Sequence, residues 1–332
     1  MAMTWIVRLG LVLAAVVLLP MAGASAQTCS VTSMSDFGST TVNIVPNATA
    51  TASGQVTYRC TSLVPFSSVR ICAYIRTTSV NQVRDAYSYY QTKDIDSRLA
   101  WEARENYGRL YARDGGGSVS TGGIRMFFSG GTGLGTDVSG QNTITLTYLT
   151  RQLQDRVRSG IYSGSSYQLV SQYKFNTTQA CETGLTGLTG TIVTPFTVTA
   201  NVPVACQFEN FTDVDFGSRG SVTLANSSST VRAFGNVGVR CTYQTPYSIT
   251  IANGLNYAGG TRRVRSGSNY IGYTLFQPGC SVPWTTTSAV TGTGATVNLL
   301  TNHQVCGQVT TPVSVAPAAG TYVDTVVVTV TF

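Results

Sequence analysis

The last residues of the chain alternate between apolar and polar side chains. One side of this run consists of Val326, Val328, Val330 and Phe332, and the other of Thr325, Thr329 and Thr331. An earlier run has the same pattern, with Tyr167, Leu169, Tyr173 and Phe175 on one side and Gln168, Gln172 and Lys174 on the other. A period of two is typical of a strand with one buried face. Each run therefore predicts a half-buried β-strand.

Short motifs recur in the same order in the two halves of the chain. The first half contains Cys29, Asp36-Phe37-Gly38, Arg59-Cys60-Thr61, Pro65-Phe66-Ser67 and Gly160-Ile161-Tyr162. The second half contains Cys206, Asp215-Phe216-Gly217, Arg240-Cys241-Thr242, Pro246-Tyr247-Ser248 and Gly320-Thr321-Tyr322. This order predicts two related domains, 27–190 and 206–332, joined by the segment 191–205. Short strands between Gly, Asn and Ser clusters predict an antiparallel β-sandwich for each of the two domains, so the predicted fold class is all-β.

The joining segment is itself a candidate strand. Its apolar positions are Phe196, Val198, Ala200, Val202 and Val204, and they alternate with Thr197, Thr199, Asn201 and Pro203. Pro195 and Pro203 favour an edge position, because proline cannot donate a ladder hydrogen bond. We expect this segment to complete the first domain by filling a groove with every second side chain. An ordinary strand of the second domain, or an extended linker, remains an alternative.

The two halves differ in the segment from about Asp85 to Gly135. The spacing of Leu99, Ala103, Tyr107 and Leu110 predicts a short amphipathic helix there. The same segment is rich in aromatic residues and arginine, which are enriched where surfaces make energetic contacts, and Met126-Phe127-Phe128 precedes a glycine-rich stretch that could project an apolar finger. The predicted surface-contact residues are Tyr87, Tyr89, Tyr90, Trp101, Tyr107, Tyr111, Met126, Phe127, Phe128 and Leu134. Core or ordinary strand positions are the alternative for these aromatic residues.

Composition narrows the class further. The chain has 332 residues, of which 42% are hydrophobic and only 11% charged, so it is neither disordered nor a coiled coil. The net charge of +7 comes almost entirely from arginine, but without a basic run it does not predict nucleic-acid binding. The single histidine, His303, gives no support to a histidine zinc site or a Ser-His-Asp triad and is expected in an ordinary loop. We therefore predict no enzymatic activity, no metal and no cofactor.

The first 26 residues are typical of a secretory signal peptide. Arg8 precedes an apolar run that is shorter than the roughly 20 residues of a membrane span, and Ala24-Ser25-Ala26 fits the small-residue cleavage rule. In a secreted chain, eight cysteines predict four disulfides, and four cysteines per domain allow three pairings. The repeat favours pairing the first two in each domain: Cys29 with Cys60, Cys72 with Cys181, Cys206 with Cys241, and Cys280 with Cys306.

The repeated motifs resemble the spore coat protein U domain family, the subunits of archaic Csu-type chaperone–usher pili. The second half matches along nearly its whole length, including Asn253-Gly254, Tyr273-Thr274-Leu275-Phe276 and Trp284, whereas the first matches at its start and end. The resemblance implies immunoglobulin-like sandwiches, the C-terminal one lacking its last strand, which the N-terminal extension of the next pilus subunit supplies. It also implies a periplasmic chaperone and an outer-membrane usher as partners.

The tip subunit of such pili has two domains, so the resemblance also implies a tip adhesin. Such a subunit would be secreted through the periplasm to the cell surface, attach to abiotic or host surfaces and promote biofilm formation. Only Gln27 and Thr28 would precede Cys29 after cleavage, too few for a donor strand, so we expect the subunit to end the fibre. A secreted coat or matrix protein without a ligand and a carbohydrate-binding module are the alternatives.

Overall fold

The computed structural model describes residues 27–79, 83–85, 88–94, 97–105, 108–109, 112–114, 124–129, 136–181, 184–226, 230–313 and 315–332. The predicted signal peptide lies outside these residues. The regular secondary structure of the described chain is nearly all strand, as predicted, with one short helix, α1 (Ser221–Asn226), and one 3₁₀ turn (Arg151–Leu153). None of the helices in the described ranges has the length and apolar character needed to cross a membrane.

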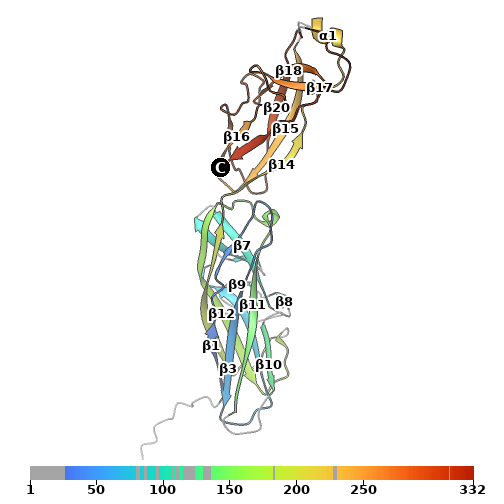
Figure 1. Ribbon diagram of the computed structural model, residues 1–332. Coiled ribbons are helices and arrows are strands. Elements are labelled where there is room, and N and C mark those ends of the chain that lie inside the picture. The colour runs from blue at the N-terminus through green and yellow to red at the C-terminus, as the bar shows by residue number, and fades with distance from the viewer. Residues whose placement is uncertain are drawn as a thin grey trace, which may run out of the picture.

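The N-terminal half (residues 27–202) forms one curled 13-stranded sheet (Figure 1). Its main path runs β1-β3-β11-β7-β6-β12-β13-β2, and β4 joins it through β12. The strands are β1 (Gln27–Met34), β2 (Ser39–Thr41), β3 (Thr51–Ser62), β4 (Ser68–Thr77), β5 (Val83–Asp85), β6 (Ser88–Asp94), β7 (Ser97–Glu105), β8 (Gly108–Arg109), β9 (Ala112–Asp114), β10 (Ile124–Ser129), β11 (Thr136–Tyr148), β12 (Gly160–Phe175) and β13 (Gly190–Val202).

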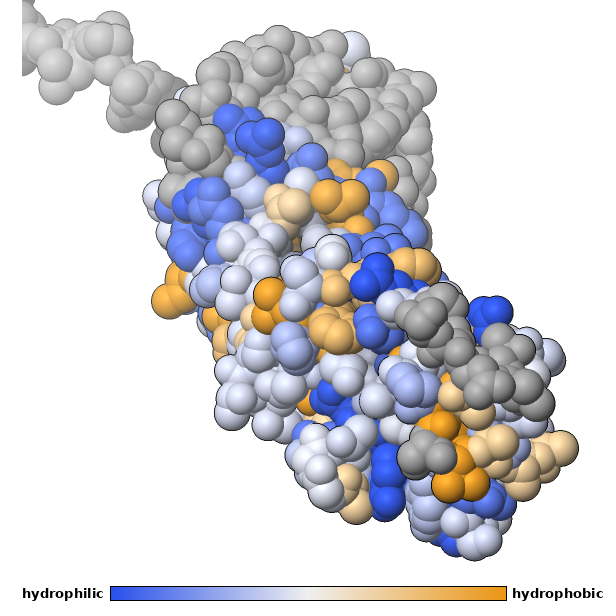
Figure 2. Space-filling view, turned by 90° about the horizontal axis from the view of Figure 1, so that it is seen from above, coloured by the Kyte–Doolittle hydropathy of each residue, from blue (hydrophilic) through white to orange (hydrophobic). Residues whose placement is uncertain are grey.

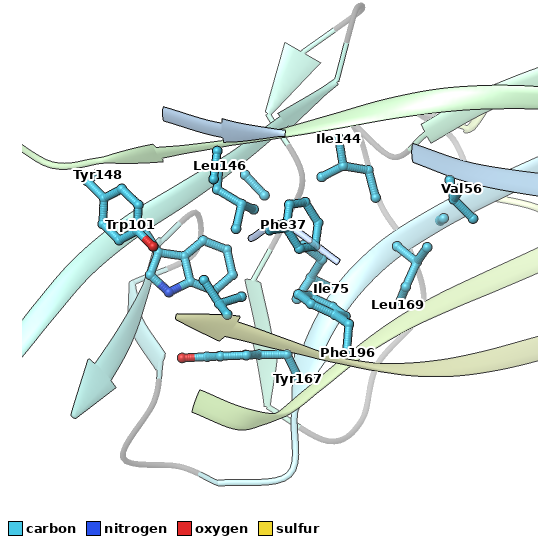
Figure 3. Packing of buried hydrophobic residues seen from close by; sticks show 14 of the residues in the cluster. Phe37, Val56, Ile75, Trp101, Ile144, Leu146, Tyr148, Tyr167, Leu169 and Phe196 are labelled. Carbon is cyan, nitrogen blue, oxygen red and sulfur yellow. The ribbon is translucent and has the colours of Figure 1, made fainter. Parts of the chain in front are cut away.

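Large aromatic side chains fill the core of this half (Figure 3). Trp101 and Tyr167 have no exposed surface, and their rings meet edge to face with centroids 5.0 Å apart. The predicted apolar side of β12 is buried, because Tyr167, Leu169, Tyr173 and Phe175 are all core residues. The alternation along the sequence therefore marks the core-facing side of this strand correctly.

The predicted amphipathic helix is wrong. Leu99 and Ala103 lie in β7, which pairs with β6 and β11, whereas Tyr107 and Leu110 lie outside the described residues. A spacing of four fits a strand period of two as well as a helix period, and Trp101 between them is also buried. Burial on the sheet therefore decides between the two periods in favour of the strand.

The C-terminal half (residues 206–332) contains two smaller sheets. Five strands follow the order β14-β15-β20-β18-β17, and three follow β19-β16-β21. The strands are β14 (Cys206–Thr212), β15 (Val231–Cys241), β16 (Pro246–Ile251), β17 (Arg262–Ser266), β18 (Asn269–Phe276), β19 (Val290–Thr293), β20 (Thr301–Val309) and β21 (Val328–Thr331). Trp284 is fully buried between the sheets, and its indole N–H donates to the carbonyl of Ile249 at 2.8 Å.

All four disulfides form as predicted. Cys29 bonds to Cys60 and Cys206 to Cys241, in each case between residues directly opposite one another on the first two long strands of the half. The other two bonds join Cys72 to Cys181 and Cys280 to Cys306. The described cysteines include no free thiol.

The two halves meet end to end (Figure 1) through a loop of the C-terminal half. Val297 has no exposed surface and belongs to the hydrophobic core of the N-terminal half. Its amide donates to the carbonyl of Asp155 at 2.8 Å, and the amide of Tyr243 donates to the carbonyl of Val157 at 2.9 Å. The junction is therefore a packed and hydrogen-bonded contact.

Ionic contacts reinforce this junction. The Glu209 carboxylate of the C-terminal half lies 3.2 Å from Arg151 of the N-terminal half and 3.0 Å from Arg240. The Arg158 guanidinium lies 5.5 Å from the ring centroid of Tyr243, within cation–π range. Arginine on the N-terminal side thus meets a carboxylate and an aromatic ring on the C-terminal side.

Candidate functional site: an open strand edge

Strand β13 closes the core of the N-terminal half. It runs antiparallel to β12 and parallel to β2. Phe196, Val198, Ala200 and Val202 are buried in the N-terminal core, whereas Val204 lies beyond the strand and is 50% exposed. Each large apolar side chain buried in this way contributes about 1.5–3 kcal/mol. The expectation of burial is thus met for four of the five side chains and wrong for Val204.

A buried side chain supports β13 where its pairing with β12 is interrupted. The register shifts between Gly164 and Tyr167, opposite Val198 and Phe196. Gln91 of β6, which has no exposed surface, donates through Nε2 to the carbonyl of Val198 at 2.6 Å. A side chain thus satisfies a backbone acceptor next to the bulge, as a buried carbonyl requires.

The repeat identifies the corresponding place in the C-terminal half. The Pro-aromatic-Ser motif precedes or opens β4 and β16, and the Gly-x-Tyr motif precedes or opens β12 and β21. By this comparison β4 corresponds to β16, and β12 corresponds to β21. β12 pairs with β13 on its other side, whereas β21 pairs only with β16 among the described strands. No described strand takes the place in the second half that β13 takes in the first.

The backbone of β21 presents unpaired groups to this edge. The amide of Ala252 donates to the carbonyl of Val327, and the antiparallel ladder between β16 and β21 continues in that register. Residues bonded to one neighbour alternate with residues whose N–H and C=O point the other way. The N–H and C=O of Val328 and Val330 therefore point away from β16, while their side chains pack half-buried on the core.

The opposite rim of the site is β14. In the N-terminal half β1 lies beside β13, and Met34 packs against the core there. Its counterpart by register is Phe211, which opposes Val237 as Met34 opposes Val56. Phe211 is 53% exposed, and its ring centroid lies 5.2 Å from that of Phe208. We call the space between β21 and β14 the open groove.

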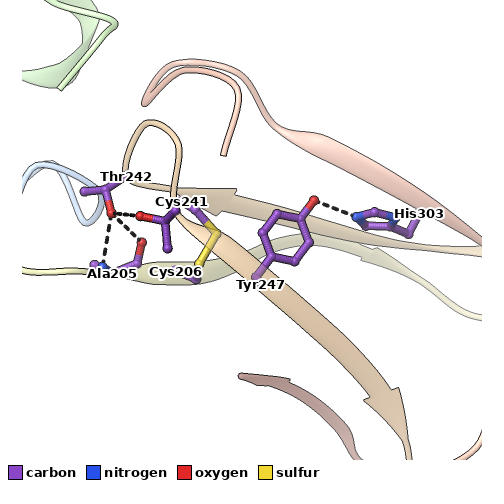
Figure 4. Close-up of a disulfide and its surroundings, with 7 residues drawn as sticks. Ala205, Cys206, Cys241, Thr242, Tyr247 and His303 are labelled. Carbon is purple, nitrogen blue, oxygen red and sulfur yellow. Dashed lines mark hydrogen bonds between the residues drawn. A yellow bond between two sulfur atoms is a disulfide. The ribbon is translucent and has the colours of Figure 1, made fainter. Parts of the chain in front are cut away.

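Buried polar groups lie near the Cys206–Cys241 disulfide at the start of β14 (Figure 4). The Tyr247 hydroxyl lies 2.9 Å from Nε2 of His303, and burial lowers the pKa of this histidine. His303 lies in β20 and is nearly buried, so its expected loop position is wrong. Nearby, the Thr242 hydroxyl donates to the carbonyl of Ala205 and accepts from its amide, which fixes the chain entering β14. A shallow hollow beside Tyr247 is lined by Pro246, Ser248, Gly292, Thr331 and Phe332.

The structure places the predicted surface-contact residues in different environments. Trp101 is fully buried, so its assignment to the surface is wrong; the surrounding sheet places it on the core side of β7. Tyr90 is half-buried, and the Arg98 guanidinium lies 5.5 Å from its ring centroid. Tyr89 lies in β6. The residues outside the described ranges are Tyr87, Tyr107, Tyr111 and Leu134.

The triplet Met126-Phe127-Phe128 lies within β10, which pairs in register with β4, so these residues are not part of a loop.

Within the described residues, no group of three or more His, Cys, Asp or Glu could hold a metal ion. The groups that sequence reasoning missed are Gln91, Phe208, Phe211 and Val297. Only the repeat, which aligns Phe211 with Met34, carried a signal for any of them.

A family model matches β13 and most of the C-terminal half. Residues 192–329 match the family model described as Spore Coat Protein U domain, so the match includes β13. No curated protein matches the chain. Among solved structures, the chain is similar to the CsuC-CsuE chaperone-tip adhesion subunit pre-assembly complex from archaic chaperone-usher Csu pili of Acinetobacter baumannii, at 16% identity and a TM-score of 0.49, over 92% of this chain and 100% of that chain.

Two further solved structures are similar at lower scores. The CupB6 tip adhesin from Pseudomonas aeruginosa is 8% identical with a TM-score of 0.36, over 92% of this chain and 94% of that one. A chaperone-tip adhesin complex of CFA/I fimbriae biogenesis is 13% identical with a TM-score of 0.29, over 78% and 84%. Residues 192–329 of this chain therefore match the spore coat protein U domain family, as the predicted resemblance implies for the second half.

Proposed function

We propose that this protein is a non-enzymatic pilus subunit whose C-terminal domain accepts a β-strand from a neighbouring subunit. The observation that carries the proposal is the contrast between two equivalent edges. β12 is paired along its length by β13, whereas the matching edge of β21 has no partner among the described strands. An unpaired edge above an apolar groove is a template for an added strand.

The N-terminal domain in this account is complete and serves as the adhesin. β13 acts as its donor strand within the same chain, through Phe196, Val198, Ala200 and Val202. The family match begins within β13, at residue 192. This supports the interpretation that β13 is the N-terminal extension of the second domain, placed in the groove of the first. Two fused subunits of this kind form the tip of a fibre, at the cell surface.

The partners follow from the same groove. A periplasmic chaperone occupies the groove before assembly. At the outer-membrane usher the next subunit replaces the chaperone, and the donor strand of that subunit then stays in the groove. The N-terminal domain then mediates attachment to an abiotic or host surface and contributes to biofilm formation. Among the predicted contact residues, half-buried Tyr90 is the one whose side chain the structure describes outside the core, and exposed Arg98 lies against its ring.

A strand peptide tests the proposal directly. The probe is a synthetic peptide with the sequence of residues 190–204, added to the full chain from residue 27, and the measurement is the melting transition of the C-terminal domain. A ligand at about 100 times its dissociation constant stabilises the folded form by about 2.7 kcal/mol. We expect the transition to rise with peptide concentration.

The control is the same peptide with Phe196, Val198 and Val202 replaced by aspartate, which keeps the backbone donors but removes the apolar side chains. It should leave the melting transition unchanged. Equal effects of both peptides, or none from either, would contradict strand acceptance.

A further inference from the structure

Exposed apolar and arginine side chains gather at the end of the C-terminal half that lies farthest from the junction. Figure 2 views the molecule from this side and shows hydrophobic groups beside hydrophilic ones. Leu255 is 79% exposed and Val323 is 63% exposed. We call this surface the end face; it consists of Leu255, Tyr257, Arg263, Arg265, Tyr270 and Val323.

These side chains are held in place. Two guanidinium groups lie near the ring of Tyr270, that of Arg263 at 4.2 Å and that of Arg265 at 5.8 Å from the ring centroid. Nε of Arg263 donates to the carbonyl of Asn256 at 2.9 Å, and the backbones of Arg265 and Val323 exchange hydrogen bonds. The arginines are therefore fixed beside the segment that leads into β21.

The repeat shows which end of the groove this is. In the N-terminal half, β13 runs antiparallel to β12 and leaves at the pair Gly160 and Val202, where the C-terminal half then packs. The counterpart of Gly160 is Gly320, three residues before Val323. A strand that ran along β21 in the same direction would leave the groove at the end face. The folded body that follows such a strand would come to lie there.

The chemistry of the end face matches the accepting side of the junction. At the junction the N-terminal half, which holds β13, supplies Arg151 and Arg158. The C-terminal half, which follows β13 along the chain, supplies the Glu209 carboxylate, the Tyr243 ring and the apolar Val297. The end face supplies fixed arginines and exposed apolar side chains in the corresponding place. Complementary charge fixes the register of such contacts and suppresses wrong partners.

We infer that the end face is the docking surface for the folded body of the subunit that donates the strand, with an acidic side chain of that body against Arg263 and Arg265. The inference rests on the proposed function, since it concerns the partner of the same groove. It adds a second contact, separate from the strand, that lies on the C-terminal domain itself.

Site-specific photo-crosslinking in cells that assemble the fibre tests this inference on the full chain. The photoreactive residue p-benzoylphenylalanine is placed at Leu255 and Val323 on the end face, at exposed Val327 immediately before β21, and at exposed Leu63 in the N-terminal half as a control. We expect Leu255, Val323 and Val327 to crosslink to one polypeptide, and Leu63 not to. The Val327 crosslinks should map to its donor strand, and the end-face crosslinks to its folded body.

A charge reversal separates the two contacts. Arg263→Glu should lower the crosslink yield at Val323 about fivefold, as expected for a partly exposed ion pair, and should leave the yield at Val327 nearly unchanged. Arg59→Glu, on the N-terminal half, is the matched control. Crosslinks at Val327 with none at Leu255 and Val323, or with a different polypeptide there, would overturn the end-face inference alone. Absence of crosslinks at Val327 would overturn the proposed function and this inference with it.

Discussion

The ring centroid of Phe196 in β13 lies 5.4 Å from that of Phe37, the aromatic residue of the first Asp-Phe-Gly motif. Phe37 is buried beneath the strand that closes its half. The corresponding Phe216 is only partly buried and packs over Gly307, where an added Cβ would lie 2.9 Å from its ring. The same motif therefore stands under a filled groove in one half and beside an open groove in the other.

Removal of the Phe196 ring should destabilise the N-terminal domain. Phe196→Ala deletes a side chain that contacts both Phe37 and Tyr167, with an expected loss of about 3–5 kcal/mol. Denaturant unfolding measures the change. Thr197→Ala, on the exposed side of the same strand, is the matched control and should change stability by less than about 0.5 kcal/mol. Equal effects of the two substitutions would contradict a closing role for β13.

Gln91 should stabilise β13 through a hydrogen bond, although it is not one of the apolar core residues that the strand covers. Gln91→Leu keeps most of the side-chain volume but leaves the Val198 carbonyl without its donor, at a cost of about 1–3 kcal/mol. Hydrogen exchange followed by mass spectrometry should show faster exchange in peptides from β13. Exposed Gln141→Leu serves as the comparison, and unchanged exchange in the Gln91 variant would argue against this support.

Acid should weaken the junction between the domains. The hydrogen bond from Arg240 is the largest cause that holds the pKa of Glu209 below its ordinary value, and Arg151 adds to the effect. Because the folded-state pKa is lowered, the stabilisation is complete above the ordinary value of about 4.3 and is lost as the pH falls through the lowered pKa.

Small-angle scattering at pH 7 and in this acid range measures the change as increased interdomain disorder. Glu209→Gln should show weaker coupling at both pH values and lose the acid-dependent step. Identical pH dependence in the wild type and this variant would exclude Glu209 as the group responsible.

Attachment should depend on the described part of the contact region. Tyr90→Ala with Arg98→Ala removes a half-buried ring and its exposed guanidinium, which contact each other. A surface-adhesion assay of fibre-bearing cells should show reduced attachment with normal amounts of fibre. Arg59→Ala together with Asp137→Ala removes an exposed ion pair elsewhere on the domain and serves as the control. Unchanged attachment would favour a structural role without a ligand.

The sequence was sufficient where a period of two and the repeat acted together. The alternation marks the buried side of β12, and the repeat favoured the disulfide pairing that forms. The interval from Leu99 to Ala103 suits both periods, so pattern alone could not exclude a helix. Burial of Trp101 was equally hidden, because an aromatic residue in a divergent segment is suitable for either a core or a surface.

Contacts between the halves were beyond sequence reasoning for another reason. Val297 lies in a short loop without periodicity, and its partners belong to the other half of the chain. Gln91 likewise gains its role only where the register of β12 and β13 shifts. Long-range placement of single side chains depends on the assembled fold rather than on local pattern.

Residue-resolved amide exchange in β21 tests the central claim most directly. In the full chain from residue 27, without an added strand, the outward-facing amides of Val328 and Val330 should exchange rapidly. On addition of the 190–204 peptide, both amides should become protected by at least about 100-fold, as for a newly formed ladder of a stable sheet. Amides of Val328 and Val330 that are already protected in the free protein, or that stay unprotected with saturating peptide, would contradict the open groove.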